Sequence, residues 1–121
     1  MIGKIIGIVG TRRRDSDKDF KLVRELFLEL YIEGDIICSG LCPKGGDRFA
    51  VKLSKEFNTP TLWFPANWNR FDKSAGFVRN DDIAQMSAVL IVCIAGDRTG
   101  GTEDTIKKFI KYHGKEELYL I

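Results

Sequence analysis

The sequence predicts a three-layer α/β fold, in which helices cover both faces of a five-stranded parallel sheet. Two patterns support this prediction. Five short segments are mostly apolar rather than alternating, as is typical of strands buried on both faces of a parallel sheet. Four segments with helical signals lie between them, so that strands and helices alternate strictly along the 121 residues.

The strands are predicted from the apolar runs. They cover residues 4–9, 35–39, 61–64, 88–94 and 117–121. Right-handed crossovers between successive strands then favour a doubly wound, Rossmann-like sheet with the strand order 3-2-1-4-5. The longest apolar run, 87–95, falls far below the ~18 residues that a membrane span requires, so no membrane association is expected.

The helices are predicted from apolar spacing and from capping residues. The first covers roughly 17–33, because apolar side chains recur every three or four residues between Phe20 and Leu30. Gly34 stands where a left-handed residue would end this helix. The other three helices are expected to begin near residue 45, to cover 76–86 and to cover 102–113, where Gly114 ends the last.

Composition and charge narrow the class of protein. Hydrophobic residues make up 44% and charged residues 30%, which excludes a disordered chain and suits one domain over 1–121. A net charge of +2 argues against nucleic-acid binding through charge alone. Three cysteines, an odd number, argue against a disulfide framework. Because the first residues lack the pattern of a signal peptide, we expect a cytoplasmic protein.

The glycines indicate where a ligand would bind. In open α/β sheets, ligands bind beyond the carboxyl ends of the strands, where the strand order reverses. In the predicted order, that point lies between the first and fourth strands. Eight of the twelve glycines fall between the end of a strand and the next helix. They are Gly10, Gly40, Gly45, Gly46, Gly76, Gly96, Gly100 and Gly101.

The loop after the fourth strand carries the clearest phosphate signal. Gly100 and Gly101 precede a predicted helix, whose first N–H groups are free to bind an anion. Thr102 could cap this helix or bond a phosphate oxygen. The alternative is that Gly100 and Gly101 only allow a tight turn between the strand and the helix. Neither the P-loop spacing nor G-x-G-x-x-G is present, so neither motif is claimed.

Arginines after the first strand supply positive charge. Arg12, nearest the strand end, is predicted to face the ligand, since a guanidinium matches phosphate with a planar fork of donors. For Arg13 and Arg14 the alternative is a surface role, paired with Asp15 and Asp17.

Two further segments are candidate ligand contacts. The start of the second helix is predicted to be a second anion cradle or to give a ribose contact by Asp47, unless Asp47 is only a helix cap; its residues are Gly40, Gly45, Gly46 and Asp47. Arg79, early in the third helix, is predicted to bind ligand. Trp68, in the long loop after the third strand, could stack on a base or pack on the edge of the domain.

The ordered set of motifs resembles a known family. Its carriers are Gly10-Thr11-Arg12, Ser39-Gly40 with Gly45-Gly46-Asp47, Trp68, Ala75-Gly76-Phe77-Val78-Arg79-Asn80 and Gly100-Gly101-Thr102. Through these motifs, nearly the whole chain resembles the SLOG superfamily. This superfamily joins the Smf/DprA proteins with the LOG-type nucleotide hydrolases. The nearest branch is the YspA/YpsA-related group of single-domain proteins. The resemblance implies a Rossmann-like pocket for a nucleotide or nucleotide derivative.

The resemblance also implies particular roles. Thr11, Ser39 and Asn80 join the predicted ligand contacts, and a homodimer is expected by analogy. LOG enzymes cleave the base from a nucleoside monophosphate, and Arg79 matches their arginine. Their glutamate stands three residues after the threonine of the glycine loop, where this chain has Thr105, so Glu103 is the available acid.

The sequence therefore supports one leading function and two alternatives. The leading hypothesis is a nucleotide-binding sensor or adaptor that requires no cofactor or metal. The first alternative is a nucleoside-monophosphate N-glycosidase that uses Glu103 or Asp104 as its acid and Arg79 to hold the phosphate, with Arg79 and Glu103 as the catalytic residues named first. The second, single-stranded nucleic-acid binding as in the DprA relatives, is disfavoured by the near-neutral charge.

Overall fold

The computed structural model describes residues 3–67, 69 and 74–121. Its five strands form one parallel sheet in the order β3-β2-β1-β4-β5, which confirms the predicted topology. The strands are β1 (Ile5–Gly10), β2 (Ile36–Ser39), β3 (Thr61–Trp63), β4 (Val89–Cys93) and β5 (Leu118–Leu120). The central strand β1 pairs with β2 and β4, so the strand order reverses between β1 and β4.

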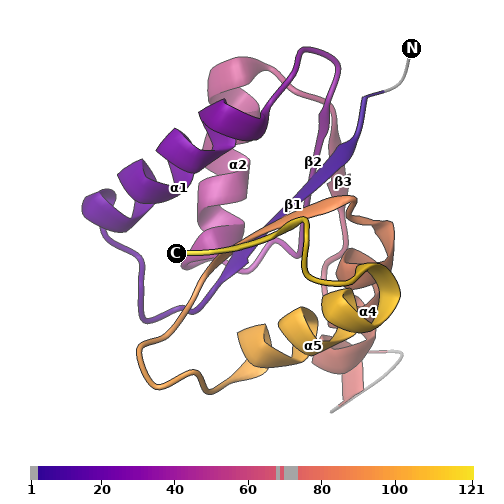
Figure 1. Ribbon diagram of the computed structural model, residues 1–121. Helices are drawn as coiled ribbons and strands as arrows, with labels where there is room; N and C mark the ends of the chain where they lie inside the picture. The colour runs from indigo at the N-terminus through magenta and orange to yellow at the C-terminus, as the bar shows by residue number, and fades with distance from the viewer. Residues whose placement is uncertain (1–2, 68, 70–73) are drawn as a thin grey trace.

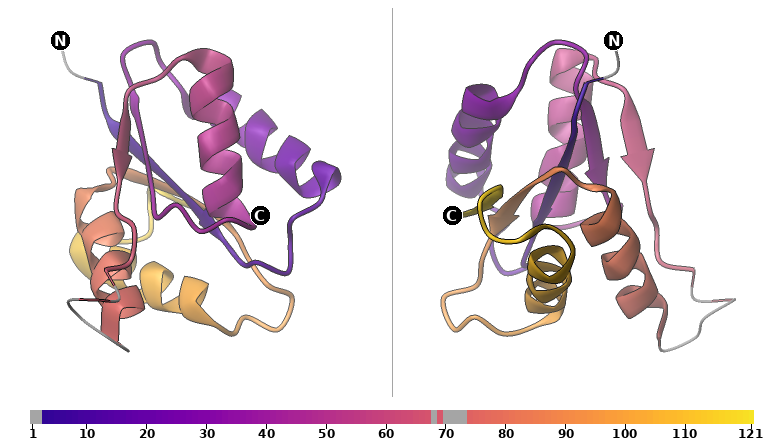
Figure 2. Two further views of the ribbon diagram at one scale, coloured as in Figure 1. Left: turned by 180° about the vertical axis from the view of Figure 1, so that it is seen from behind. Right: turned by 45° about the vertical axis from the view of Figure 1, so that its right-hand side comes forward.

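Helices cover both faces of this sheet. They are α1 (Asp17–Leu30), α2 (Gly46–Phe57), α4 (Ala75–Met86) and α5 (Gly101–His113). The pair α1 and α2 lies on one face, and α4 and α5 lie on the other (Figures 1 and 2). Among the described residues, no helix combines the length and apolar character needed to span a membrane.

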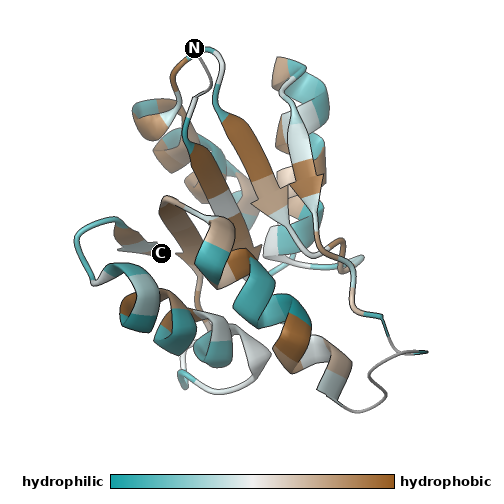
Figure 3. Cartoon of the chain, turned by 90° about the vertical axis from the view of Figure 1, so that its right-hand side faces the viewer, coloured by the Kyte–Doolittle hydropathy of each residue, from teal (hydrophilic) through white to brown (hydrophobic). Residues whose placement is uncertain are grey.

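The core forms two layers, one on each side of the sheet. Alternate residues of β4 point to opposite layers: Ile91 packs with Phe27 and Phe49, whereas Val92 packs with Phe109. All five residues of β4 are buried, which explains why this strand reads as a continuous apolar run. Figure 3 shows the strands as strongly hydrophobic, with hydrophilic residues gathered on the helices.

The first helix ends earlier than predicted. It stops at Leu30, and the N–H of Tyr31 donates to the Phe27 carbonyl at 2.8 Å. Gly34 does adopt a positive φ of 99°, but in the turn before β2. The buried carboxylate of Asp35 accepts the N–H of residue 32 at 2.9 Å and so draws the chain into that turn. The prediction that Gly34 ends the helix is therefore wrong.

Candidate functional site

A cavity of about 370 Å³ lies at the carboxyl edge of the sheet, between β1 and β4. This is the position at which doubly wound sheets bind ligands. Most of the predicted ligand residues line it. They are Gly10, Thr11, Arg12, Asp47, Arg79, Asn80, Gly100, Gly101 and Thr102.

Three predicted ligand residues lie behind the cavity wall instead. Ser39 is fully buried and bonds Asp47. A Cβ on Gly40 would lie 2.7 Å from Cδ of Arg79, so this glycine leaves room for that side chain. A Cβ on Gly46 would lie 2.1 Å from the carbonyl carbon of Val9, so this glycine lets α2 approach β1. These residues shape the site without lining it.

The N-terminus of α5 opens directly into the cavity. Gly100 is its N-cap with φ 105°, and no described side chain forms a capping hydrogen bond with the helix. Thr102 is therefore not the cap. Chain neighbours and the backbone of the helix itself aside, no atom of the described part of the chain lies within 4 Å of the positions that a Cβ would take on Gly100 and Gly101. Uncapped N–H groups beside open space form a ready site for an anion.

Of the arginines that the structure describes, three line the cavity: two of them, Arg12 and Arg79, are predicted ligand residues, and the third is Arg13. Arg12 is exposed, and among the residues that the structure describes it forms no hydrogen bond or ion pair. Arg79 is mostly buried: its Nε donates to Oδ1 of Asn80 at 3.1 Å, and its Nη1 lies 3.4 Å from the carbonyl of Gly40. Arg12 is thus free to bind a ligand, and Arg79 is held in place beside it.

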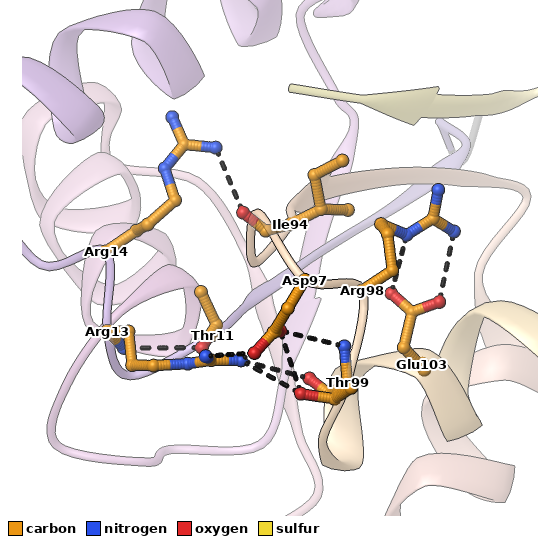
Figure 4. Close-up of polar contacts among 8 residues, drawn as sticks. All are labelled: Thr11, Arg13, Arg14, Ile94, Asp97, Arg98, Thr99 and Glu103. Carbon is orange, nitrogen blue, oxygen red and sulfur yellow. Dashed lines mark hydrogen bonds and ion pairs between the residues drawn. The ribbon is translucent and has the colours of Figure 1, made fainter.

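Arg13 and Arg14 tie neighbouring segments together. Arg13 donates from both terminal nitrogens to Asp97 at 2.8 Å, and so links the β1 loop to the loop before α5 (Figure 4). Arg14 donates to Asp19 at 3.0 Å and to the carbonyl of Ile94 at 3.1 Å. The predicted pairing with the two acids at 15 and 17 is wrong, because folding brings other acids closer. Arg13 is exposed but also lines the cavity, whereas Arg14 is partly buried.

The link between Arg13 and Asp97 is expected to hold the glycine loop in shape. Because Arg13 donates to it, the pKa of Asp97 is lower than usual, so the contact persists at neutral pH and is lost only as the pH falls through that lowered pKa. Asp97→Ala should speed amide hydrogen exchange at 99–101. Asp17→Ala on α1 is the control and should leave those amides unchanged. Equal exchange in both variants would contradict this role.

Asn80 connects Arg79 to the start of α5. Its Nδ2 donates to the carbonyl of Gly101 at 3.2 Å and to Oδ2 of Asp104 at 3.1 Å. Its Oδ1 accepts the Nε of Arg79. Every polar atom of this buried side chain is therefore engaged within the protein, so Asn80 positions other groups of the site.

Asp47 is a buried acid in the cavity wall. It is 6% exposed, its Oδ2 accepts the N–H of Cys42 at 3.0 Å, and Nη1 of Arg79 lies 3.9 Å from the same oxygen. Burial raises the pKa of this carboxyl, although the hydrogen bonds and the arginine charge oppose the shift. Asp47 is the second residue of α2, whose N-cap is Gly45, so the helix-cap alternative is not what the structure shows.

Glu103 lies apart from the cavity. Its carboxylate accepts Nε of Arg98 at 2.9 Å and Nη2 at 3.0 Å (Figure 4), and it does not line the cavity. Thr105 lines the cavity instead, and so does Cys42, which is not among the predicted ligand residues. Trp68 lies outside the described residues. Among those residues, no group of three or more His, Cys, Asp or Glu side chains is placed to hold a metal.

Comparisons with known proteins support the fold. A solved structure titled as the molybdenum cofactor binding protein from the phototrophic bacterium Rippkaea orientalis is similar, with a TM-score of 0.73 and 23% sequence identity. The likeness covers 99% of this chain and 77% of that one. No protein-family model matches the chain, and no curated sequence matches it. The likeness shows a shared three-layer fold.

Proposed function

We propose that this chain binds a small phosphate-bearing ligand, a nucleotide or a nucleotide derivative, as a sensor or adaptor. One observation carries the proposal. Arg12, which has no partner among the described residues, and the uncapped N-terminus of α5 line the same cavity. A free guanidinium and free helix N–H groups are the donors that phosphate oxygens accept.

The phosphate is best placed at the start of α5. Gly100 and Gly101 leave the space above the helix open, and Thr102 adds a hydroxyl at the cavity wall. Arg79 approaches from α4, with its orientation held by Asn80. Together these groups offer backbone donors, a hydroxyl and two guanidinium groups to one anion.

The size of the cavity favours a compact ligand. Its volume of about 370 Å³ is near the lower end of the ~300–1,000 Å³ that small-molecule sites span. A mononucleotide suits this space better than a dinucleotide. The rest of such a ligand would extend toward Thr11 and Cys42, which also line the cavity.

The molybdenum cofactor is a second ligand to test. The solved structure that shares this fold is that of a molybdenum cofactor binding protein. A shared fold does not by itself transfer a ligand. The cofactor therefore belongs in the same panel as the nucleotides, measured under the same conditions.

Arg12→Ala should weaken binding without loss of stability. Charge-assisted hydrogen bonds contribute roughly 1.5–3 kcal/mol, so affinity for the best ligand of the panel should fall about tenfold or more. Calorimetry measures the affinity, and thermal unfolding reports stability. Lys21→Ala, which removes one exposed charge from α1, is the control and should bind as the wild type does. If no member of the panel binds to the wild type, the proposal is wrong.

A further inference from the structure

The hydroxyl of Ser39 faces two acceptors but carries one proton. Its Oγ lies 2.5 Å from the carbonyl oxygen of Ile8 and 2.9 Å from Oδ1 of Asp47. The shorter contact takes the proton, since a carbonyl oxygen can only accept. Two buried oxygen atoms then face each other at 2.9 Å, and a proton is needed between them. A protonated Asp47 supplies it, donating from Oδ1 to Oγ of Ser39.

The surroundings of the second carboxyl oxygen agree with a neutral acid. Among the described residues, Oδ2 accepts one N–H, from Cys42 at 3.0 Å. The guanidinium nitrogen nearest to it in this part of the chain, Nη1 of Arg79, is 3.9 Å away, beyond hydrogen-bond range. Burial acts in the same direction, because it raises the pKa of Asp47. Of the residues that the structure describes, Arg12 and the buried thiol of Cys38 also interact electrostatically with Asp47, and burial raises the pKa of that thiol to about 12.

We propose that Asp47 is a neutral carboxylic acid while an anion occupies the cavity, so that anion binding is coupled to the uptake of one proton. This inference rests on the proposed function. A neutral Asp47 leaves the charges of Arg12 and Arg79 uncompensated and available to an anion. An ionised Asp47 would attract Arg79 and repel the same anion. Affinity should therefore be highest at low pH and fall as the pH rises through the pKa of Asp47.

The proton is tested in the ligand-free protein by the carboxyl ¹³C resonance of Asp47, assigned with Asp47→Asn. The resonance should titrate above the ordinary aspartate range of about 3–5. Ser39→Ala decides the direction of the hydrogen bond. If Asp47 donates, this variant removes the acceptor of the neutral acid and lowers the pKa. If Ser39 donates, the variant raises it, which would overturn the inference, as would an ordinary or low pKa in the wild type.

The coupling is tested with inorganic sulfate, whose charge is constant between pH 5 and 8. Wild-type affinity should fall by up to about tenfold per pH unit above the pKa of Asp47, as one-proton linkage requires. Asp47→Asn, which mimics the neutral acid and can donate to Ser39, should bind with little pH dependence. If this variant fails to fold, Ser39→Ala takes its place in the test. Because Ser39→Ala should lower the pKa of Asp47, its affinity for sulfate should begin to fall at a lower pH than that of the wild type.

The outcomes separate the coupling from the anion site. Equal pH dependence in the wild type and Asp47→Asn would overturn the coupling and leave the anion site standing. Absence of sulfate binding to both proteins at every pH would overturn the anion site, and the coupling with it.

Discussion

Gly46→Ala is expected to lower the free energy of unfolding by about 3 kcal/mol, one of the largest effects of adding a single methyl group to this protein. The added Cβ would lie 2.1 Å from the carbonyl carbon of Val9 and 2.4 Å from the backbone nitrogen of Gly10. Both atoms belong to the central strand, so neither can move without disturbing the sheet. Urea denaturation followed by circular dichroism measures the change.

Gly101→Ala is the matched control for stability. Like Gly46, Gly101 is the first residue of a helix and follows a glycine N-cap. Apart from its chain neighbours and the backbone of its own helix, no atom of the described residues lies within 4 Å of its added Cβ, so the variant should be as stable as the wild type. Similar losses in the two variants would show that the position in the helix, rather than contact with β1, causes the destabilisation.

Arg79→Met should reduce affinity for the phosphate-bearing ligand by about 100-fold. Arg79 is largely buried in the cavity wall and oriented by Asn80, so its charge acts at short range with little solvent screening. Methionine keeps the length and the apolar stem of the side chain but removes the charge. Calorimetry with the best-binding member of the ligand panel measures the loss.

Two further variants test whether the loss of affinity is specific to the guanidinium group of Arg79. Arg24→Met removes a guanidinium that pairs with Glu56 between α1 and α2, and it should leave affinity unchanged. Arg79→Lys keeps the charge without the planar fork and should fall between the wild type and Arg79→Met. Wild-type affinity in Arg79→Met would exclude this arginine from the binding site.

The strand order and the position of the cavity could be predicted from local features. Buried strands read as apolar runs, and the rule for crossover handedness turns their alternation with helices into one sheet topology. The glycines after β1 and β4 then fall at the edge where the order reverses. The differences from the prediction lie at the ends of elements. The first helix ends at Leu30, and the Asp35 carboxylate, rather than Gly34, draws the chain into the following turn.

The partners of individual side chains could not be predicted, since they join segments far apart in the sequence. Arg13 meets Asp97 across 84 positions, and Asn80 meets the Gly101 carbonyl across 21. No periodicity or motif encodes such pairs. The pair of Arg98 and Glu103 is local, but the sequence did not show which way this acid points: the fold holds Glu103, the available acid of the enzyme alternative, against Arg98 and away from the cavity.

Gly46 illustrates the difference between what the sequence predicts and what only the tertiary structure decides. The sequence alone determined that a glycine precedes a helix at the ligand edge of the sheet. It could not distinguish a glycine that admits a ligand from one that admits a neighbouring strand, because both uses need only a missing Cβ. The tertiary structure decided the matter by placing the backbone of Val9 where that Cβ would lie. At Gly101 it left the same space open.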